Sequence, residues 1–560
     1  MKFKTLFFVL FCTVHSYAID FNEIVSTFSA DKSALQRKFS NHLSDAYFIR
    51  FTRFYSDWKI KLEAIDFNSL TKEQKVDYVL LRNYIEKSTY FHQLAQKEFD
   101  NVKFVAEKAK ELYDFNEKRK SGSTPQSSQL AGVFDATEKA FRNEINTIKN
   151  TKPFSNWQNA DLAAKVIKAL IKATEESFAF YNEYNPDFMW WMQQPHQKLM
   201  KTLGEYEAAV RQNYINTSVK DDGSGIIGKP LGREALLNDL KFEFIAYTPE
   251  QLIEEANKQF AWCENEMLKA SKAMGFGRDW KKALEKVKQS YVAPGQWQED
   301  VNHLANEAVQ FIEDRNLITV PPLAKETWRM TMLSAEAQKI SPFFLGGEVI
   351  QIAYPTAGMD YDDKMMSMRG NNPYFSRATV QHELIPGHQL QLFMMDRYKP
   401  YRTLFQTPFW IEGWALYWEF NLWDKQFPRT PEEKIGMLFW RMHRCARIIF
   451  SLNYHLEKMT PQQCIDFLVE KVGHERANAA AEVRRSFMGG YGPLYQIAYM
   501  TGGLQFYSLR KQLVDSGKMS EKEFHDTILQ NNTMPVEIVK AILTGEALKK
   551  EASPKWKFLD

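Results

Sequence analysis

The chain has 560 residues, of which 25% are charged and 44% are hydrophobic, a composition typical of a globular protein. Its length is sufficient for one large hydrophobic core or for two lobes. The formal net charge is only +3, from 72 basic and 69 acidic residues, so no extended field of one sign argues for binding to nucleic acid or to an anionic membrane. Aromatic residues make up 14% of the chain, which suits a large core and also a deep cleft that binds apolar side chains.

Residues 1–18 have the pattern of a secretory signal peptide. Two lysines precede a short apolar run at 6–14, and Ser16 and Ala18 provide small residues near its end. The apolar run is about half the length that would span a membrane, and no other stretch reaches the roughly eighteen apolar residues of a transmembrane helix. The sequence therefore predicts an exported protein without a transmembrane segment.

Cysteines are few and widely spaced. Cys12 directly follows Phe11, and so bulky a neighbour fits a lipoprotein cleavage site poorly, so we expect a periplasmic or secreted protein and not a lipoprotein. The remaining Cys263, Cys445 and Cys464 are too few for a disulfide framework and too scattered for a zinc–thiolate site. One disulfide bridge is possible, but nothing in the sequence requires it.

The N-terminal part of the chain has a helical pattern. Between residues 21 and 220, apolar residues recur three and four positions apart, and the alternation typical of strands is nearly absent. A polar stretch with two glycines at 220–225 then indicates a boundary between lobes. We therefore expect an N-terminal helical lobe at 19–225 and a second lobe at 226–560.

The second lobe is also predicted to be mainly helical. Thr248, Pro249 and Gln251 have the sequence of a capping box at the start of a helix that runs to about Met274. One stretch, 347–355, is short, partly alternating and bounded by glycine and proline, which indicates a strand. The predicted fold class is therefore mainly α with a small β-sheet.

The stretch that organises this lobe contains two histidines, His382 and His388, with Glu383 directly after the first. In the common zinc motif the two histidines are four residues apart and lie on one face of a helix. A spacing of six places them on different faces of an ideal helix, about 600° apart. Pro386 lacks an N–H group and crowds the carbonyl four residues before it, and Gly387 permits unusual backbone. We therefore predict a break in the helix that brings both rings to one metal ion.

A third ligand is predicted on the next helix. Glu412 comes 24 residues after His388 and opens an amphipathic helix, where its carboxylate would complete a zinc site with His382 and His388. Glu419 lies seven residues further, on nearly the same helix face, and is expected to orient a zinc-binding histidine without touching the metal. Most other histidines are expected to be hydrogen-bonded within helices.

These motifs resemble those of the bacterial domain-of-unknown-function family 885. That family is similar to the gluzincin metallopeptidases, a mostly helical group related in plan to angiotensin-converting enzyme and Taq carboxypeptidase. The resemblance covers most of 230–515. The chain has Pro493-Leu494-Tyr495 where the family usually has Pro-Gly-Gln, and Asn453-Tyr454-His455 where it often has Gly-Leu-His. The matching residues are His382–His388 with Gln391, Glu412–Tyr417 with Glu419, and Glu482–Arg485 followed by Pro493, Tyr499, Gly502 and Leu509–Arg510.

The resemblance implies a zincin-like (gluzincin) peptidase fold, with the small sheet beside a deep cleft and the catalytic lobe at 226–560. It also implies Zn²⁺ as the cofactor and a peptide as the substrate. Glu383 would take a proton from the attacking water and pass it to the leaving amine. Tyr499, Tyr495 or His455 would donate a hydrogen bond to the developing oxyanion, by analogy with the tyrosine and histidine residues of related peptidases.

Two features are candidates for substrate binding. The strand at 349–354, which ends at Tyr354, would pair with an extended peptide or would be an internal strand of the sheet. Arg485 and Arg510 would bind a substrate carboxylate or form structural ion pairs, and the structural role is favoured for Arg510. If Arg485 faces the cleft, a carboxypeptidase or dipeptidase is favoured over an endopeptidase.

The function that these observations favour is an exported zinc metallopeptidase that hydrolyses short peptides as a carboxypeptidase, dipeptidase or oligopeptidase. One alternative is a catalytically silent protein of the same fold that binds peptides, which the presence of Glu383 argues against. Another is a zinc amidase that acts on cell-wall peptides and has the same metal centre. The sequence indicates no particular oligomeric state.

Overall fold

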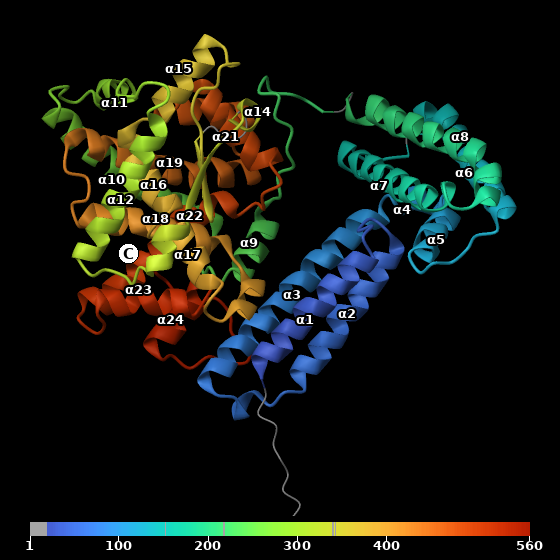
Figure 1. Ribbon diagram of the computed structural model, residues 1–560, viewed down its shortest axis with the longest axis horizontal. Coiled ribbons are helices and arrows are strands. Elements are labelled where there is room, and N and C mark those ends of the chain that lie inside the picture. Colours follow the sequence, from blue (N-terminus) through green and yellow to red (C-terminus); the bar gives the residue numbers. More distant parts are fainter. Residues whose placement is uncertain (1–19, 152, 217–218, 339–340, 342, 560) are drawn as a thin grey trace, which may run out of the picture.

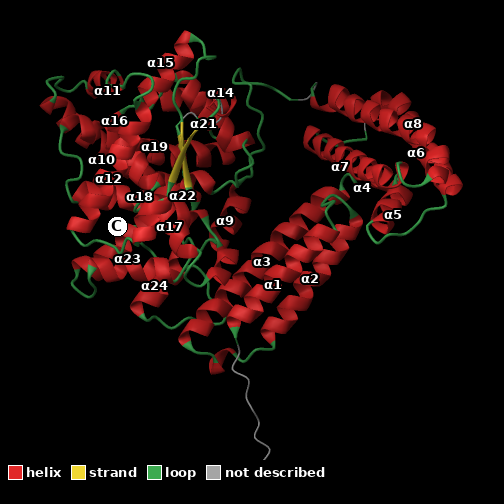
Figure 2. Cartoon of the chain, in the orientation of Figure 1, coloured by secondary structure: helices red, strands yellow, loops and turns green. Residues whose placement is uncertain are grey.

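The computed structural model describes residues 20–151, 153–216, 219–338, 341 and 343–559. The predicted signal peptide at 1–18 lies outside these residues. Within them helices dominate, as predicted, and a small three-stranded sheet accounts for all the β-structure (Figures 1 and 2). No helix in these ranges combines the length and the apolar character that crossing a membrane requires.

The N-terminal helices form two groups. They are α1 (Phe21–Lys38), α2 (Asp45–Glu63), η1 (Phe67–Ser69), α3 (Lys72–Asp100), α4 (Lys103–Glu107), α5 (Lys110–Arg119), α6 (Ser127–Thr151), α7 (Trp157–Asn182), α8 (Pro186–Val210) and η2 (Arg211–Ile215). In Figure 1, α1, α2 and α3 lie side by side as a bundle, and α4 to α8 form an arm beyond its end. The arm has its own hydrophobic core, which extends from Phe99 to Val210 and includes Phe48.

The C-terminal helices surround the sheet. They are α9 (Arg233–Phe242), α10 (Pro249–Ala273), α11 (Trp280–Lys288), α12 (Trp297–Asp314), α13 (Pro322–Thr327), α14 (Ala335–Gln338), α15 (Tyr361–Gly370), α16 (Pro373–Glu383), α17 (His388–Met395), η3 (Pro400–Phe405), α18 (Pro408–Asp424), α19 (Pro431–His455), α20 (Pro461–Phe467), η4 (Leu468–Val472), α21 (Arg476–Met488), α22 (Tyr495–Arg510), η5 (Lys511–Asp515), α23 (Glu521–Gln530) and α24 (Val536–Thr544). In Figure 1 they make up the larger body, with α16, α18, α19 and α22 at its centre.

Side-chain caps determine where several of these helices begin. The predicted capping box of α10 is confirmed: Thr248 accepts a hydrogen bond from the backbone N–H of Gln251, whose side chain accepts one from the N–H of Thr248. α19 begins with the same arrangement between Thr430 and Glu433. α16 begins at a proline, with the side chain of Asn372 accepting hydrogen bonds from the next backbone N–H groups.

The largest hydrophobic core is shared between the N-terminal bundle and the C-terminal helices. It contains Phe28 and Leu81 of the bundle together with residues of α10, α18, α19 and α22, among them Trp414 and Cys445. Packing therefore groups α1–α3 with the C-terminal body and α4–α8 with one another. The lobe boundary expected at residue 225 stays a prediction.

The sheet contains β1 (Arg329–Met332), β2 (Phe344–Leu345) and β3 (Val349–Ile352), in the order β1-β3-β2. β3 pairs in parallel with β1 and antiparallel with β2, so the strand predicted at 347–355 is confirmed as a central strand. A central strand has no free edge to which a peptide could add. The expected strand addition at β3 is therefore wrong, and the alternative of an internal strand holds.

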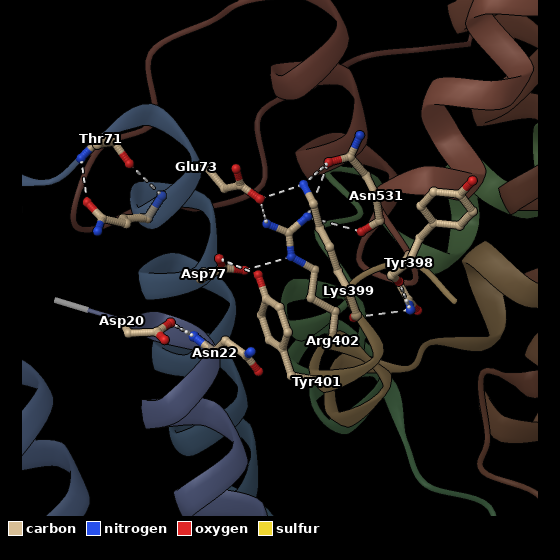
Figure 3. Close-up of polar contacts among 12 residues, drawn as sticks. Asp20, Asn22, Thr71, Glu73, Asp77, Tyr398, Lys399, Tyr401, Arg402 and Asn531 are labelled. Carbon is tan, nitrogen blue, oxygen red and sulfur yellow. Dashed lines mark hydrogen bonds and ion pairs between the residues drawn. The ribbon is translucent and has the colours of Figure 1, made fainter. Parts of the chain in front are cut away.

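A buried ion pair joins the bundle to the C-terminal body (Figure 3). Arg402 of η3 donates to Asp77 of α3 at 2.7 Å, and their side chains are 0% and 2% exposed. Tyr401 donates to the other carboxylate oxygen of Asp77 at 3.0 Å, and Arg402 donates to the backbone carbonyl of Asn531 at 3.0 Å. One arginine thus connects α3 with the segment that follows α23.

We expect Asp77→Ala to lower the free energy of unfolding by about 3–5 kcal/mol, because it leaves the Arg402 guanidinium buried without its partner. Urea denaturation followed by circular dichroism measures the change. Glu73→Ala is the matched control, since Glu73 lies 3.6 Å from the same arginine but its side chain is 57% exposed. The control should cost less than about 1 kcal/mol; equal losses in the two variants would contradict this role for the buried pair.

Candidate metal centre

The two histidines of the central motif lie on either side of a helix break. α16 ends at Glu383 and α17 begins at His388, so the predicted interruption is confirmed. Gly387 fits there because a Cβ atom at this position would lie 1.8 Å from the backbone oxygen of His382. The Nε1–H of Trp414 donates to the carbonyl of Pro386 at 2.9 Å and fixes the connecting loop to α18.

The break brings the two imidazoles together. The ring centres of His382 and His388 lie 4.9 Å apart, with their planes at 86°. Glu412 of α18 completes the group, and its carboxylate oxygen Oε2 lies 3.2 Å from Nε2 of His388 and 3.7 Å from Nε2 of His382. Ligand atoms of these three buried residues all lie within 4.8 Å of one another. Two imidazole nitrogens and one carboxylate oxygen are the donor set of a catalytic zinc site, so the residues fit this metal.

The outer ring nitrogens of both histidines have partners. Nδ1 of His382 lies 2.8 Å from Glu419, and Nδ1 of His388 lies 3.4 Å from the side-chain oxygen of Gln391. These contacts direct the Nε2 atoms toward Glu412, as acceptors on the outer nitrogen do at known metal sites. Glu419 therefore occupies the position expected of a residue that orients His382.

Charge interactions within the group are strong. Burial alone would lower the pKa of His382, but Glu412 and Glu419 outweigh it and raise that pKa to about 9. Burial alone would raise the pKa of Glu412, but His388 and His382 outweigh it and hold that pKa well below its usual range. The carboxylate is thus ionised and favours a proton on His382, and a metal ion bound here would take the place of that proton.

The three residues line a cavity of about 280 Å³ together with Glu383 and the end of β2. The backbone passes very close to Glu383 at Gly346, where a Cβ atom would lie 1.8 Å from the carboxylate oxygen. The carboxylate of Glu383 therefore points into the cavity beside the candidate metal ligands. A carboxylate in this position could accept a proton from a molecule bound beside the three residues.

Two of the three candidate oxyanion donors also line the cavity. Tyr495 donates a hydrogen bond from its hydroxyl to Glu412, and the hydroxyl of Tyr499 lies 3.3 Å from that of Tyr495. Burial raises the pKa of Tyr499 to about 12, and burial with the nearby Tyr499 and Glu412 raises that of Tyr495 further. Both phenols therefore keep their protons at neutral pH and can donate them in hydrogen bonds.

Two expected site residues lie elsewhere. Tyr354 is buried in a small core, where its ring stacks on Trp297 at 5.4 Å and its hydroxyl donates to the carbonyl of Val292. Its expected role in substrate binding is wrong, because the ring faces α12. His455 does not line the cavity, so the expectation that it stabilises an oxyanion is also wrong.

The cavity also contains residues that the sequence analysis missed. Arg444 and Arg447 of α19 are buried beside the ring of Tyr499. A signal was present, because Arg441, Arg444 and Arg447 recur every three residues in a helix that is otherwise largely apolar. Arginines in such a buried helix need partners or a function.

Glycines set the distance between the two helices that carry Glu412 and Tyr495. A Cβ atom at Gly413 of α18 would lie 2.6 Å from the Cα of Gly502 in α22, and one at Gly502 would lie 2.0 Å from the carbonyl oxygen of Phe409. The backbones therefore touch, as small residues at a helix crossing allow. This contact places the tyrosines of α22 against the carboxylate of α18.

Residues 28–543 match a family described as bacterial protein of unknown function (DUF885), and the chain belongs to that family. The solved structure of a putative lipoprotein of unknown function from Shewanella oneidensis is similar, with a TM-score of 0.69 and 17% identity, over 94% of this chain and 100% of that one. A putative lipoprotein from Colwellia psychrerythraea is similar with a TM-score of 0.52 and 17% identity, over 75% of this chain and 74% of that one. At this identity the likeness concerns the fold alone. No curated protein matches the sequence.

These descriptions correct the expectation about lipid attachment. Phe11 before Cys12 was interpreted as evidence against a lipoprotein, but both similar structures belong to proteins described as putative lipoproteins. A single bulky residue before a cysteine is a weak criterion, because neighbouring positions also contribute to recognition of a cleavage site. The expectation is therefore wrong. Both residues lie outside the described part of the chain.

We expect Glu419→Ala to weaken zinc binding about 10- to 100-fold, because His382 loses the acceptor that orients its ring. Competition with a chromophoric chelator measures the affinity. Glu254→Ala provides the control, since this carboxylate is 70% exposed on α10 and pairs with Lys258. If Glu419→Ala binds zinc as tightly as the control, Glu419 has no part in the metal centre.

Proposed function

We propose that this chain is an exported zinc-dependent metallopeptidase with a zincin-like (gluzincin) fold, which hydrolyses peptide bonds of short peptides. The observation that carries the proposal is the grouping of His382, His388 and Glu412 within 4.8 Å in a cavity that Glu383 also lines. A metal-binding set beside an unligated carboxylate is the requirement for hydrolysis by an activated water. The descriptions of the similar structures as putative lipoproteins support export.

Each residue of the cavity has a role in this proposal. His382, His388 and Glu412 would hold zinc, which when bound lowers the pKa of water to ~7 and polarises a carbonyl. The Glu383 carboxylate takes a proton from the attacking water and passes it to the nitrogen of the leaving amine. The Tyr495 hydroxyl donates to Glu412 and the Tyr499 hydroxyl donates to that of Tyr495, and either would rotate to donate to the developing oxyanion.

The first test compares the wild type with Glu383→Gln in metal content and peptide hydrolysis. Both proteins should contain one zinc ion, because Glu383 is not a ligand, and the variant should be slower by at least about a hundredfold, because it lacks the base. Elemental analysis and mass spectrometry of a digested peptide library give the two readouts. A wild type that lacks stoichiometric zinc and cleaves no more than the variant would overturn the peptidase proposal.

The second test uses Gly346→Ala, which does not change any reacting group. The new methyl group would lie 1.8 Å from the Glu383 carboxylate oxygen, so the base must move. It would also lie 3.1 Å from Cδ2 of His388, where a shift of a few tenths of an ångström relieves the contact and keeps the ligand in place. We expect kcat to fall about a hundredfold with zinc content unchanged, because a displacement of this size misaligns the proton transfer. Gly358→Ala is the control, since no atom lies within 4 Å of its Cβ position. Unchanged kcat in Gly346→Ala would argue against Glu383 as the base.

A further inference from the structure

Three arginines line the same cavity as the candidate metal ligands: Arg444 and Arg447 on α19, and Arg485 on α21. We call them the arginine cluster. Arg444 and Arg447 are only 5% and 3% exposed. Their guanidinium carbons lie 4.8 and 4.5 Å from the ring centre of Tyr499, whose ring stacks on that of His382 at 6.3 Å. One aromatic ring therefore separates the cluster from the metal centre.

The three arginines of the cluster differ in how closely a carboxylate pairs with them. Glu482 forms a bidentate pair with Arg447 at 2.7 and 3.0 Å. Glu419 lies 4.0 Å from Arg444 but already accepts a hydrogen bond from the metal centre. Among the described residues, no carboxylate lies within 4.0 Å of the Arg485 guanidinium, and the buried Nε atoms of Arg444 and Arg485 have no hydrogen-bond partner. Glu383 and Glu412 also line this cavity, but neither forms an ion pair with the cluster within 4.0 Å among the described residues, so Arg485 is the guanidinium that a ligand could pair with.

Arg510 is an arginine with a structural role, and its surroundings differ from those of Arg485. Its guanidinium lies 3.2 Å from Glu521 and 3.1 Å from Asp515, so two carboxylates neutralise its charge. The structural ion pair that the sequence analysis favoured for Arg510 is present. Arg485 forms no such pair with any residue that the structure describes, and it lines the cavity.

A largely buried guanidinium without an ion-pair partner is costly, so Arg485 calls for an anionic ligand. The planar fork of a guanidinium matches the two oxygens of a carboxylate. We propose that the arginine cluster binds the C-terminal carboxylate of the peptide substrate, so that cleavage releases residues from the C-terminal end. This inference rests on the proposed peptidase function and adds to it the end of the substrate that is recognised.

A second cavity provides space for the rest of the peptide. It measures about 590 Å³ and shares Ile411, Glu412 and Tyr495 with the first cavity, but none of the arginines. It extends to Lys87 and Phe91 on α3. The metal centre therefore lies where an arginine-lined cavity meets a larger one, which suits a substrate held by its C-terminus with its N-terminal part beyond the metal.

Binding to the zinc-free protein tests the proposal separately from catalysis. Three probes are titrated by calorimetry: N-acetyl-Phe-Phe with a free carboxylate, the same peptide as its C-terminal amide, and N-acetyl-Phe-Glu-amide. The free acid should bind roughly tenfold to a hundredfold more tightly than its amide, because it gains hydrogen bonds to charged groups. Arg485→Gln should abolish this difference, and Arg485→Lys should leave part of it.

Arg484→Gln is the matched control, since Arg484 precedes Arg485 on α21 but is exposed. It should retain the full preference for the free acid, and thermal unfolding checks that each variant is folded. The proposal would be overturned if the wild type binds the acid and the amide equally tightly. It would also be overturned if Arg485→Gln weakens the binding of both peptides by the same factor. Tighter binding of the Glu-amide probe than of the free acid would also overturn it, because the cluster would then recognise a side chain.

Hydrolysis by the zinc-loaded protein separates this inference from the proposed function. If the free acid binds more tightly than the amide but neither is hydrolysed, the arginine cluster is a carboxylate-binding site and the peptidase proposal is wrong. If acid and amide are hydrolysed with equal kcat/KM, the protein is a peptidase but the arginine cluster does not recognise the C-terminal carboxylate.

Discussion

The candidate metal centre depends on one backbone contact between two helices. Gly413 of α18 and Gly502 of α22 approach so closely that neither position has room for a side chain. Glu412 is adjacent to the first glycine, and Tyr499 and Tyr495 precede the second by three and seven residues, which places them on the same side of α22. The hydrogen bond from Tyr495 to Glu412 follows from this contact. The glycine crossing therefore positions a candidate metal ligand and two hydrogen-bond donors at once.

Around this contact the structure combines buried charges with an unusually apolar environment. α18 is buried on nearly all its faces, and Trp410, Trp414 and Trp418 are fully enclosed. A helix that is apolar all round lies inside a protein and not at its surface. The high aromatic content is thus used mainly in the core. The large core offsets the cost of burying Glu412 and the arginine cluster, and burial in turn strengthens the interactions between these charges.

Much of the local structure could be predicted because its causes lie close together in the sequence. The capping box at Thr248, the strand before Pro355 and the helix break at Gly387 each depend on neighbouring residues, and all are present. Tyr354 and His455 were misplaced because their surroundings are distant in the chain. The ring of Tyr354 stacks on Trp297, and the backbone carbonyl of His455 accepts a hydrogen bond from Gly232. Sequence spacing does not specify contacts of this kind.

The sequence by itself determined the helical class and the candidate metal ligands, because periodicity, caps and the interrupted motif are local properties of the chain. The family match over 28–543 agrees with the resemblance that these motifs show. Only the tertiary structure decided which side chains share the cavity. It brought Arg444 and Arg447 of one helix together with Arg485 of another, and within the described part of the chain it paired Arg447 with Glu482 but gave Arg485 no carboxylate within 4.0 Å. The physical reason is that burial and charge balance depend on how helices pack, and packing brings together residues that are far apart in sequence.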